Sequence, residues 1–243
     1  MKYFFHSLLV CFIVLTYSNY GLTNRAPNPP FYLRCYDQIN PVGVNAHPYF
    51  GWYISDDDDH EIQTKYQVII ASTFENISAN VGDVWDSGSI TSRNQNYVYC
   101  PENALKSAQR YYWKVRTWDK DQQVSPYSEP ATFDTGFFTN EDWNGAKWIK
   151  RPSEENETFT YFRKKDNLKN KTVKRAIVYL VSCHSYHLYI NGTSVGKGFF
   201  HHYPQYSYYH AVDITPHIQK SQTITFALMT HWYGGGQGRA AGS

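Results

Sequence analysis

The chain has 243 residues, and its 23 Lys and Arg against 21 Asp and Glu give a formal net charge of +2 at pH 7. This near balance gives no basis for nucleic acid or an anionic membrane surface as a partner. Aromatic residues make up 18% of the chain, with 22 Tyr and 7 Trp. Because these side chains fit pleated surfaces, the composition favours an extracellular β-protein, in which aromatic faces pack a core or stack on sugar rings.

The N-terminal segment has the features of a secretory signal peptide, which we expect to span residues 1–18. Lys2 supplies the positive charge, residues 4–15 form a short apolar run, and Thr16 and Ser18 are small residues suited to cleavage. The run is too short for a good transmembrane span, and no later stretch is apolar enough to form one. We therefore expect a secreted, extracellular protein without a membrane span.

Three cysteines remain after removal of Cys11 with the signal peptide, namely Cys35, Cys100 and Cys183. In an oxidising compartment, one disulfide and one free thiol is the simplest arrangement. Cys35 and Cys100 both lie in the first half of the chain, so we expect them to pair. Three unpaired, partly buried thiols are the alternative.

Four Asn-X-Ser/Thr sequons lie downstream of the signal segment. In a secreted protein such sequons mark exposed loops that carry N-linked glycans. The expected glycosylation sites are Asn76, Asn156, Asn170 and Asn191.

The first domain is expected over residues 27–137, after a proline-rich lead-in. Its clearest strand is 111–118, where Tyr111, Trp113 and Val115 alternate with Lys114 and Arg116, as in a half-buried strand. Turn signals separate it from further short segments of the same kind. The other expected strands are 31–36, 48–54, 63–71, 84–88, 96–100 and 128–133. About seven such strands predict an immunoglobulin-like or fibronectin-III-like antiparallel β-sandwich.

Four adjacent aspartates, residues 56–59, follow the second of these strands. Carboxylates bind calcium, but calcium-binding loops need spaced ligands and usually a glycine for the turn. We interpret the run as like charges in a solvent-exposed hairpin loop, and we expect no metal site.

The second domain is expected over residues 145–233, with Trp143 and Trp148 packed at the boundary. Residues 176–181 alternate apolar side chains on both faces, which predicts a strand buried on both sides. Asn191-Gly192 is a strong two-residue hairpin signal, because both central residues of a type I′ turn need positive φ. Other expected elements are strands at 157–164, 186–190 and 223–230, a helical turn at 213–216 and a flexible glycine-rich tail at 234–243.

The best local candidates for sugar contact lie in and after the aromatic, histidine-rich segment 199–209. A pyranose needs a flat apolar face together with hydrogen-bonding groups, and this set offers both. Packing of the same aromatic residues between domains is the competing interpretation. The candidate carbohydrate-binding residues are His202, Tyr203, Tyr206 and Trp232.

No catalytic constellation, metal site or cofactor motif emerges from the remaining residues. His184 and His187 would point to opposite faces of a strand, which disfavours a shared zinc. The chain has no phosphate-binding glycine loop, nucleophile elbow or nucleotide fingerprint. The acidic side chains that could act as a pair sit in turn or capping contexts, where Asp bonds the backbone. They are Asp119, Asp121, Glu129, Asp134 and Asp213.

Several motifs in order resemble the N-terminal region of bacterial-type α-L-rhamnosidases. In the first domain these are Trp85-Asp-Ser-Gly88, Tyr112-Trp-Lys-Val-Arg116 and Phe133-Asp-Thr-Gly136. In the second they are Tyr186-His-Leu-Tyr-Ile-Asn-Gly192, Asp213-Ile-Thr215 and His231-Trp-Tyr-Gly234. The resemblance implies an all-β chain of two sandwiches. A fibronectin-III/Ig-like domain would precede a jelly-roll, galactose-binding-like domain that is incomplete here.

Enzymes of this family are similar in placing a helical (α/α)6 barrel after the β-domains, with an acid and a base for inverting hydrolysis. No residue of this chain matches those carboxylates, so the catalytic set is empty here and the chain is expected to be inactive alone. The resemblance implies non-catalytic β-domains that support the barrel or bind rhamnose-containing glycans. A free-standing secreted carbohydrate-binding protein and a fibronectin-III-type adhesion protein are the alternatives.

Overall fold

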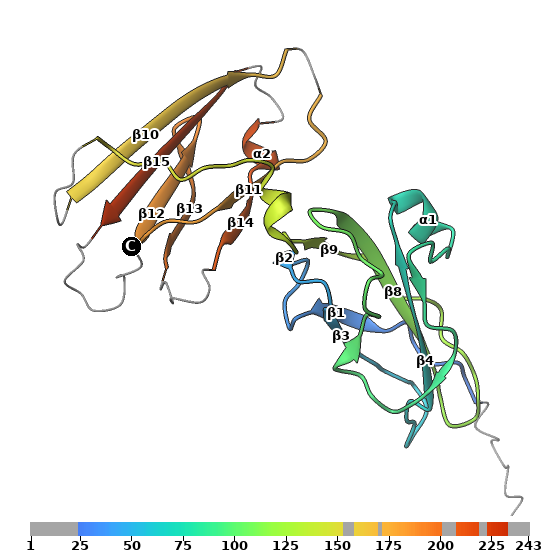
Figure 1. Ribbon diagram of the computed structural model, residues 1–243. Helices are drawn as coiled ribbons and strands as arrows, with labels where there is room; N and C mark the ends of the chain where they lie inside the picture. The colour runs from blue at the N-terminus through green and yellow to red at the C-terminus, as the bar shows by residue number, and fades with distance from the viewer. Residues whose placement is uncertain (1–23, 153–157, 170–171, 201–207, 219–222, 233–243) are drawn as a thin grey trace, which may run out of the picture.

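The aromatic strand expected at 111–118 forms β8 (Arg110–Trp118), a central strand of the largest sheet. The computed structural model describes residues 24–152, 158–169, 172–200, 208–218 and 223–232. The expected signal peptide and the glycine-rich tail lie outside these ranges. Figure 1 shows two groups of β-sheets in chain order, so the prediction of two consecutive β-sandwiches is confirmed.

The first group consists of a six-stranded and a three-stranded sheet. The larger has the order β2-β9-β8-β4-β5, with β6 also on β4, and the smaller has the order β1-β3-β7. Pairing is antiparallel except between β2 and β9, which run parallel. The strands besides β8 are β1 (Phe31–Cys35), β2 (Val42–Val44), β3 (Tyr49–Tyr53), β4 (Lys65–Ala71), β5 (Trp85–Asp86), β6 (Ile90–Thr91), β7 (Val98–Tyr99) and β9 (Ala131–Thr135).

Large aromatic side chains join the two sheets of the first domain. Phe50 of β3 meets Trp113 of β8 with ring centroids 4.5 Å apart, and Phe133 of β9 lies 5.6 Å from Phe50. Trp52 is fully buried, and its indole N–H donates to the Gln63 side-chain oxygen at 3.0 Å. Fully buried aromatics with satisfied polar atoms make this the core of the sandwich.

The outer face of the large sheet is also covered, which the alternation along 63–71 does not predict. Residues 74–78 form helix α1 (Phe74–Ser78), and the Thr73 hydroxyl accepts from the Asn76 N–H at its start. Ile77 of this helix packs with Ile69 and Ala71 of β4. Accordingly, β4 is buried on both faces over its second half.

The second group has a four-stranded sheet, β10-β15-β12-β13, and a two-stranded sheet, β11-β14. Asn191 and Gly192 have φ of 50° and 84°, which confirms the predicted hairpin. The prediction that 176–181 is buried on both faces is wrong, because β11 pairs only with β14 and stays mostly half-buried. The elements are β10 (Thr158–Asn167), β11 (Ile177–Leu180), β12 (Ser185–Ile190), β13 (Thr193–Phe199), β14 (His210–Asp213), α2 (Thr215–Ile218) and β15 (Thr223–Trp232), preceded by the short helix η1 (Asn140–Trp143).

Two glycines in β13 let the smaller sheet approach the larger one. A Cβ at Gly198 would lie 2.5 Å from His210 and 2.8 Å from Tyr186, and a Cβ at Gly196 would lie 3.3 Å from Val212. The Tyr186 hydroxyl and His210 Nδ1 are hydrogen-bonded at 2.9 Å in the same place. Burial lowers the pKa of His210, which favours the neutral imidazole in this contact.

We predict that Trp113→Ala lowers the free energy of unfolding by about 3–5 kcal/mol, because it removes a fully buried indole from the centre of the first sandwich. Urea unfolding followed by fluorescence and circular dichroism measures this loss. Trp148→Ala is the matched control: its side chain is 69% exposed, so the loss stays below about 1 kcal/mol. Equal losses in the two variants would contradict this assignment of the core.

Candidate functional site

The junction between the two domains is a strap of backbone, residues 135–137, that follows β9. The Tyr209 hydroxyl donates to the Phe137 carbonyl at 3.1 Å and accepts from the Phe137 N–H at 2.7 Å. The Tyr179 hydroxyl donates to the Thr135 carbonyl at 3.1 Å, and its ring stacks on Phe137 at 4.0 Å. Two tyrosines of the second domain thus bind the end of the first domain through main-chain groups.

Aromatic packing and a glycine complete the junction. The Trp143 ring lies 5.0 Å from Phe137 and 5.7 Å from Tyr209, so its predicted place at the boundary is confirmed. Trp148, predicted to pack there too, is 69% exposed. Gly136 is required because a Cβ there would collide with the Tyr209 hydroxyl. Burial raises the pKa of Tyr179 to about 12, so its phenol stays a donor at neutral pH.

A network of four charged side chains lies beside this strap. Asp134, whose side chain is 2% exposed, accepts from Arg110 Nε at 3.2 Å and from Arg110 Nη2 at 3.0 Å. Arg175 of the second domain forms an ion pair with the same carboxylate and donates to Asp213 at 3.3 Å. Burial raises the pKa of Asp134, while the two guanidinium groups act in the opposite direction.

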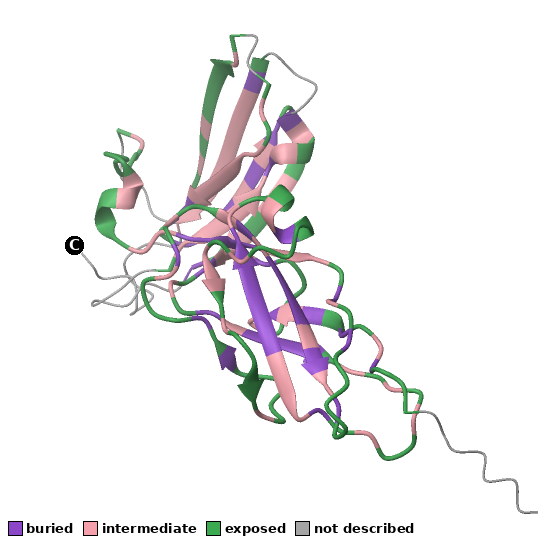
Figure 2. Ribbon diagram, turned by 90° about the vertical axis from the view of Figure 1, so that its right-hand side faces the viewer, coloured by how far each residue is buried: buried purple, intermediate pink, exposed green. Residues whose placement is uncertain are grey.

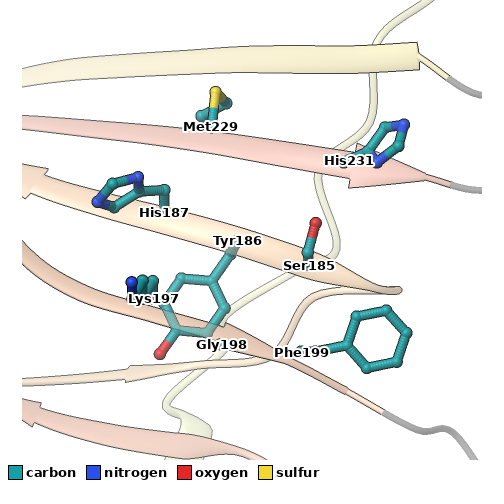
Figure 3. A pocket seen from close by; sticks show the side chains of 8 residues that line it. All are labelled: Ser185, Tyr186, His187, Lys197, Gly198, Phe199, Met229 and His231. Carbon is teal, nitrogen blue, oxygen red and sulfur yellow. The ribbon is translucent and has the colours of Figure 1, made fainter.

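A shallow hollow of about 480 Å³ lies on the four-stranded sheet of the second domain. Figure 3 shows His187 of β12 and Met229 and His231 of β15 projecting from neighbouring strands, with Phe199 at the edge. The register explains the grouping, because His187 pairs with Met229 and Ser185 pairs with both His231 and Phe199. Alternate residues of each strand therefore line one face.

The polar groups of this hollow are held in fixed positions. His187 Nε2 lies 2.7 Å from the Ser194 hydroxyl, and His187 Nδ1 lies 2.9 Å from the Tyr189 hydroxyl. Beside the hollow, the Phe159 ring of β10 stacks on His231 at 4.2 Å with 12° between the planes. Flat aromatic faces next to oriented hydroxyl and imidazole groups are suited to binding a small polar ring.

Of the predicted sugar-binding residues, the structure describes only Trp232. It follows His231 on β15, so its side chain points to the opposite face of the sheet from the hollow. His202, Tyr203 and Tyr206 lie outside the described residues. Sequence reasoning missed the hollow because its residues come from three strands. The period-two pattern of 185–190 is the sequence signal that could have indicated the hollow. It places His187 on the opposite face of the strand from the buried Tyr186, Leu188 and Ile190.

The structure holds Cys35, Cys100 and Cys183 as free thiols, so the expected Cys35–Cys100 disulfide is not formed. Both cysteines face the first core, but β3 lies between β1 and β7. Two strand spacings of about 4.8 Å place their Cα atoms beyond the ~7 Å limit for a disulfide. Burial raises the pKa of the Cys100 thiol to about 12 and raises that of Cys35 as well.

Two of the four sequon asparagines are described by the structure. Asn191 is exposed in the hairpin turn, but its amide donates to the His217 carbonyl at 3.2 Å and its Oδ1 accepts from the Thr225 N–H. Asn76 is half-buried in α1. Asn156 and Asn170 lie outside the described residues. No helix in the described part of the chain has the length and apolarity needed to cross a membrane.

All three comparisons with known proteins find similarity to α-L-rhamnosidases. Residues 30–139 match the family described as Rha78A-like, N-terminal immunoglobulin domain. An α-L-rhamnosidase of Formosa agariphila is 30% identical over 223 residues, which cover 81% of this chain and 23% of the relative. The α-L-rhamnosidase structure from Dictyoglumus thermophilum matches with a TM-score of 0.74 and 31% identity, over 86% of this chain and 26% of that chain. This chain therefore spans about a quarter of the length of these relatives.

We predict that Asp134→Asn lowers the free energy of unfolding by about 3 kcal/mol, because it leaves Arg110 and Arg175 without their buried counter-charge. Denaturant unfolding measures the change. Asp213→Asn is the matched control, since this carboxylate belongs to the same network but is 32% exposed, and Asn keeps the cap on Thr215. Its loss should stay below about 1 kcal/mol. A larger loss in Asp213→Asn would show that Asp134 is not the centre of the network.

Proposed function

We propose that this chain acts as the non-catalytic N-terminal part of a secreted α-L-rhamnosidase-like glycoside hydrolase, because it is similar to the N-terminal region of such enzymes. The observation that carries the proposal is the match of 86% of this chain to about a quarter of a rhamnosidase structure at a TM-score of 0.74. We assign residues 27–137 to the first domain and residues 145–233 to the second. The apolar N-terminal segment and the four sequons support secretion.

The proposed role is mechanical: the two domains hold a fixed relative orientation so that a catalytic domain or a substrate can be positioned. The tyrosine contacts to residues 135–137 and the buried ion network around Asp134 support such a role. In the whole enzyme, hydrolysis of terminal α-L-rhamnosides with inversion needs an acid and a base separated by a water. Asp134 and Asp213 are bound to guanidinium groups, which makes both carboxylates poor candidates for the general acid or the general base.

We expect no release of the aryl group from an aryl α-L-rhamnoside by the purified chain, because Asp134 and Asp213, the carboxylates that lie together at the junction, are held in ion pairs. The chain would be expressed in a secreting eukaryotic host with residues 1–18 intact. Recovery from the medium tests secretion, and retention inside the cells would count against it. Turnover that Asp134→Asn or another carboxylate substitution abolishes would refute the non-catalytic role.

A second function, carbohydrate binding by the chain itself, is favoured by the hollow on the four-stranded sheet. Its lining combines the Phe199 ring, the doubly hydrogen-bonded His187 imidazole and the Lys197 ammonium group. A terminal rhamnosyl residue has a methyl group and three ring hydroxyls, so one apolar wall and several polar groups suit it. The name shared by the relatives makes rhamnose-containing glycans the first ligands to test.

We predict that L-rhamnose perturbs the NMR signals of His187 and His231 in the full chain. His187→Ala should weaken binding by about tenfold, because it removes the imidazole face and the partner that orients the Ser194 and Tyr189 hydroxyls. Trp232→Ala is the control, since its side chain lies on the other face of β15. If Trp232→Ala removes binding and His187→Ala does not, the site lies at the segment 199–209 instead. Absence of any perturbation would rule out rhamnose binding by these domains.

A further inference from the structure

Three carboxylates from two separate loops meet at one end of the first domain. Asp56 and Glu61 lie in the connection between β3 and β4, and Asp119 directly follows β8. One carboxylate oxygen from each lies within 4.8 Å of the other two. The group lies about 26 Å along β8 from Arg110 and the domain junction, because eight residue steps of about 3.3 Å separate Trp118 from Arg110.

Two of these carboxylates have a buried oxygen without a partner. Asp119 is 1% exposed; its Oδ1 accepts from the Gln123 N–H at 2.8 Å, but its Oδ2 makes no hydrogen bond to any described residue. Asp56 is similar, with Oδ1 accepting from the Asp58 N–H at 3.0 Å and Oδ2 buried without a described partner. Buried polar atoms are almost always satisfied, so a pair of orphan carboxylate oxygens indicates a missing ligand.

The only ammonium group that any described contact brings to the cluster is Lys120. Its Nζ lies 2.8 Å from a Glu61 oxygen, and its side chain is 43% exposed while that of Glu61 is 5% exposed. It also donates to the Asp59 carbonyl at 3.4 Å. One ammonium against three carboxylates leaves a local charge of −2 when all are ionised.

We propose that Asp56, Glu61 and Asp119 form a calcium-binding site that fastens the β3–β4 connection to the turn after β8. The ligand atoms are all oxygens, which selects a hard cation over zinc or copper. A separation of up to 4.8 Å equals twice a Ca²⁺–O distance of about 2.4 Å, so one ion can contact all three carboxylates. Water and the Asp59 carbonyl, which already faces the Lys120 ammonium group, complete the shell.

The other aspartates of the acidic run are used elsewhere. Asp57 faces Arg25 at 3.9 Å and accepts from the Asn28 amide, and Asp58 accepts from the Arg25 N–H. The site therefore takes only one side chain, that of Asp56, from residues 56–59 and draws its other two carboxylates from outside the run. The three carboxylates are thus spaced along the chain, as calcium ligands must be, whereas four adjacent carboxylates would not form a calcium loop.

Isothermal titration of the full chain with CaCl₂ after EDTA treatment tests the proposal. We expect a single site with a dissociation constant of about 10⁻⁴–10⁻³ M, typical of extracellular calcium modules. Asp119→Asn should weaken binding by about tenfold or more, since Asn keeps the Gln123 contact but loses the charge. Lys120→Met should strengthen binding by about threefold or more, because it removes the competing ammonium group.

Asp57→Asn is the matched control: it removes one charge from the same loop outside the cluster, and its effect should stay within about twofold. Glu61→Gln serves as a second site variant should Asp119→Asn fail to fold by circular dichroism. No calcium binding by the wild-type chain up to about 10 mM overturns the proposal. Equal weakening by Asp57→Asn and Asp119→Asn, or an equal response to Mg²⁺, shows general charge screening and overturns it too.

Discussion

One buried carboxylate, Asp134, ties the two domains together. It receives a two-point contact from Arg110 of its own domain and an ion pair from Arg175 of the next. A buried charge without partners costs several kcal/mol. The ionised Asp134 carboxylate is therefore stabilised only while both guanidinium groups are in place. The relative placement of the domains is therefore coupled to the stability of the end of β9. The hydrogen bonds between the tyrosine hydroxyls and residues 135–137 also fix the relative orientation of the two domains, because main-chain atoms have no alternative rotamers.

The two domains differ in how completely they are packed. Figure 2 shows buried residues running through the strands of the first domain, whereas the long strands of the second are mostly half-buried or exposed. On β10, Phe159 is 51% and Tyr161 is 73% exposed. Exposed aromatic residues on an otherwise regular sheet indicate a surface used for contact. The same face contains the hollow around His187, so this face of the four-stranded sheet is the less covered part of the second domain.

The first domain has buried carboxylates at both ends, and the two groups differ in the positive charges that balance them. At the junction, Asp134 is neutralised by arginines fixed in the fold. At the far end, the partly exposed Lys120 is the one counter-charge that the described contacts bring to Asp56, Glu61 and Asp119. A protein-borne counter-charge makes the junction permanent, whereas a bound cation would make the far loops sensitive to the calcium concentration. The difference between a permanent and an ion-dependent link follows from which counter-charges the chain carries.

The local sequence pattern by itself determined which residues of several strands face the core and where one hairpin turns. Alternation along 111–118, 186–190 and 223–230 places the correct side chains in the core, and Asn191-Gly192 specifies its hairpin because both residues tolerate positive φ. The ordered motifs across the chain also predicted the resemblance to the N-terminal region of α-L-rhamnosidases, which the comparisons confirm.

The sequence did not predict the features that depend on contacts between residues distant along the chain. The helix α1 that covers β4, the separation of Cys35 from Cys100 by β3 and the hollow around His187 all depend on strand order and register. The meeting of Asp56 and Glu61 with Asp119, and of Asp134 with Arg175, depends likewise on how the loops and domains are brought together. Periodicity encodes the face on which a residue lies, but only the tertiary structure decides which residues meet across strands, loops and domains.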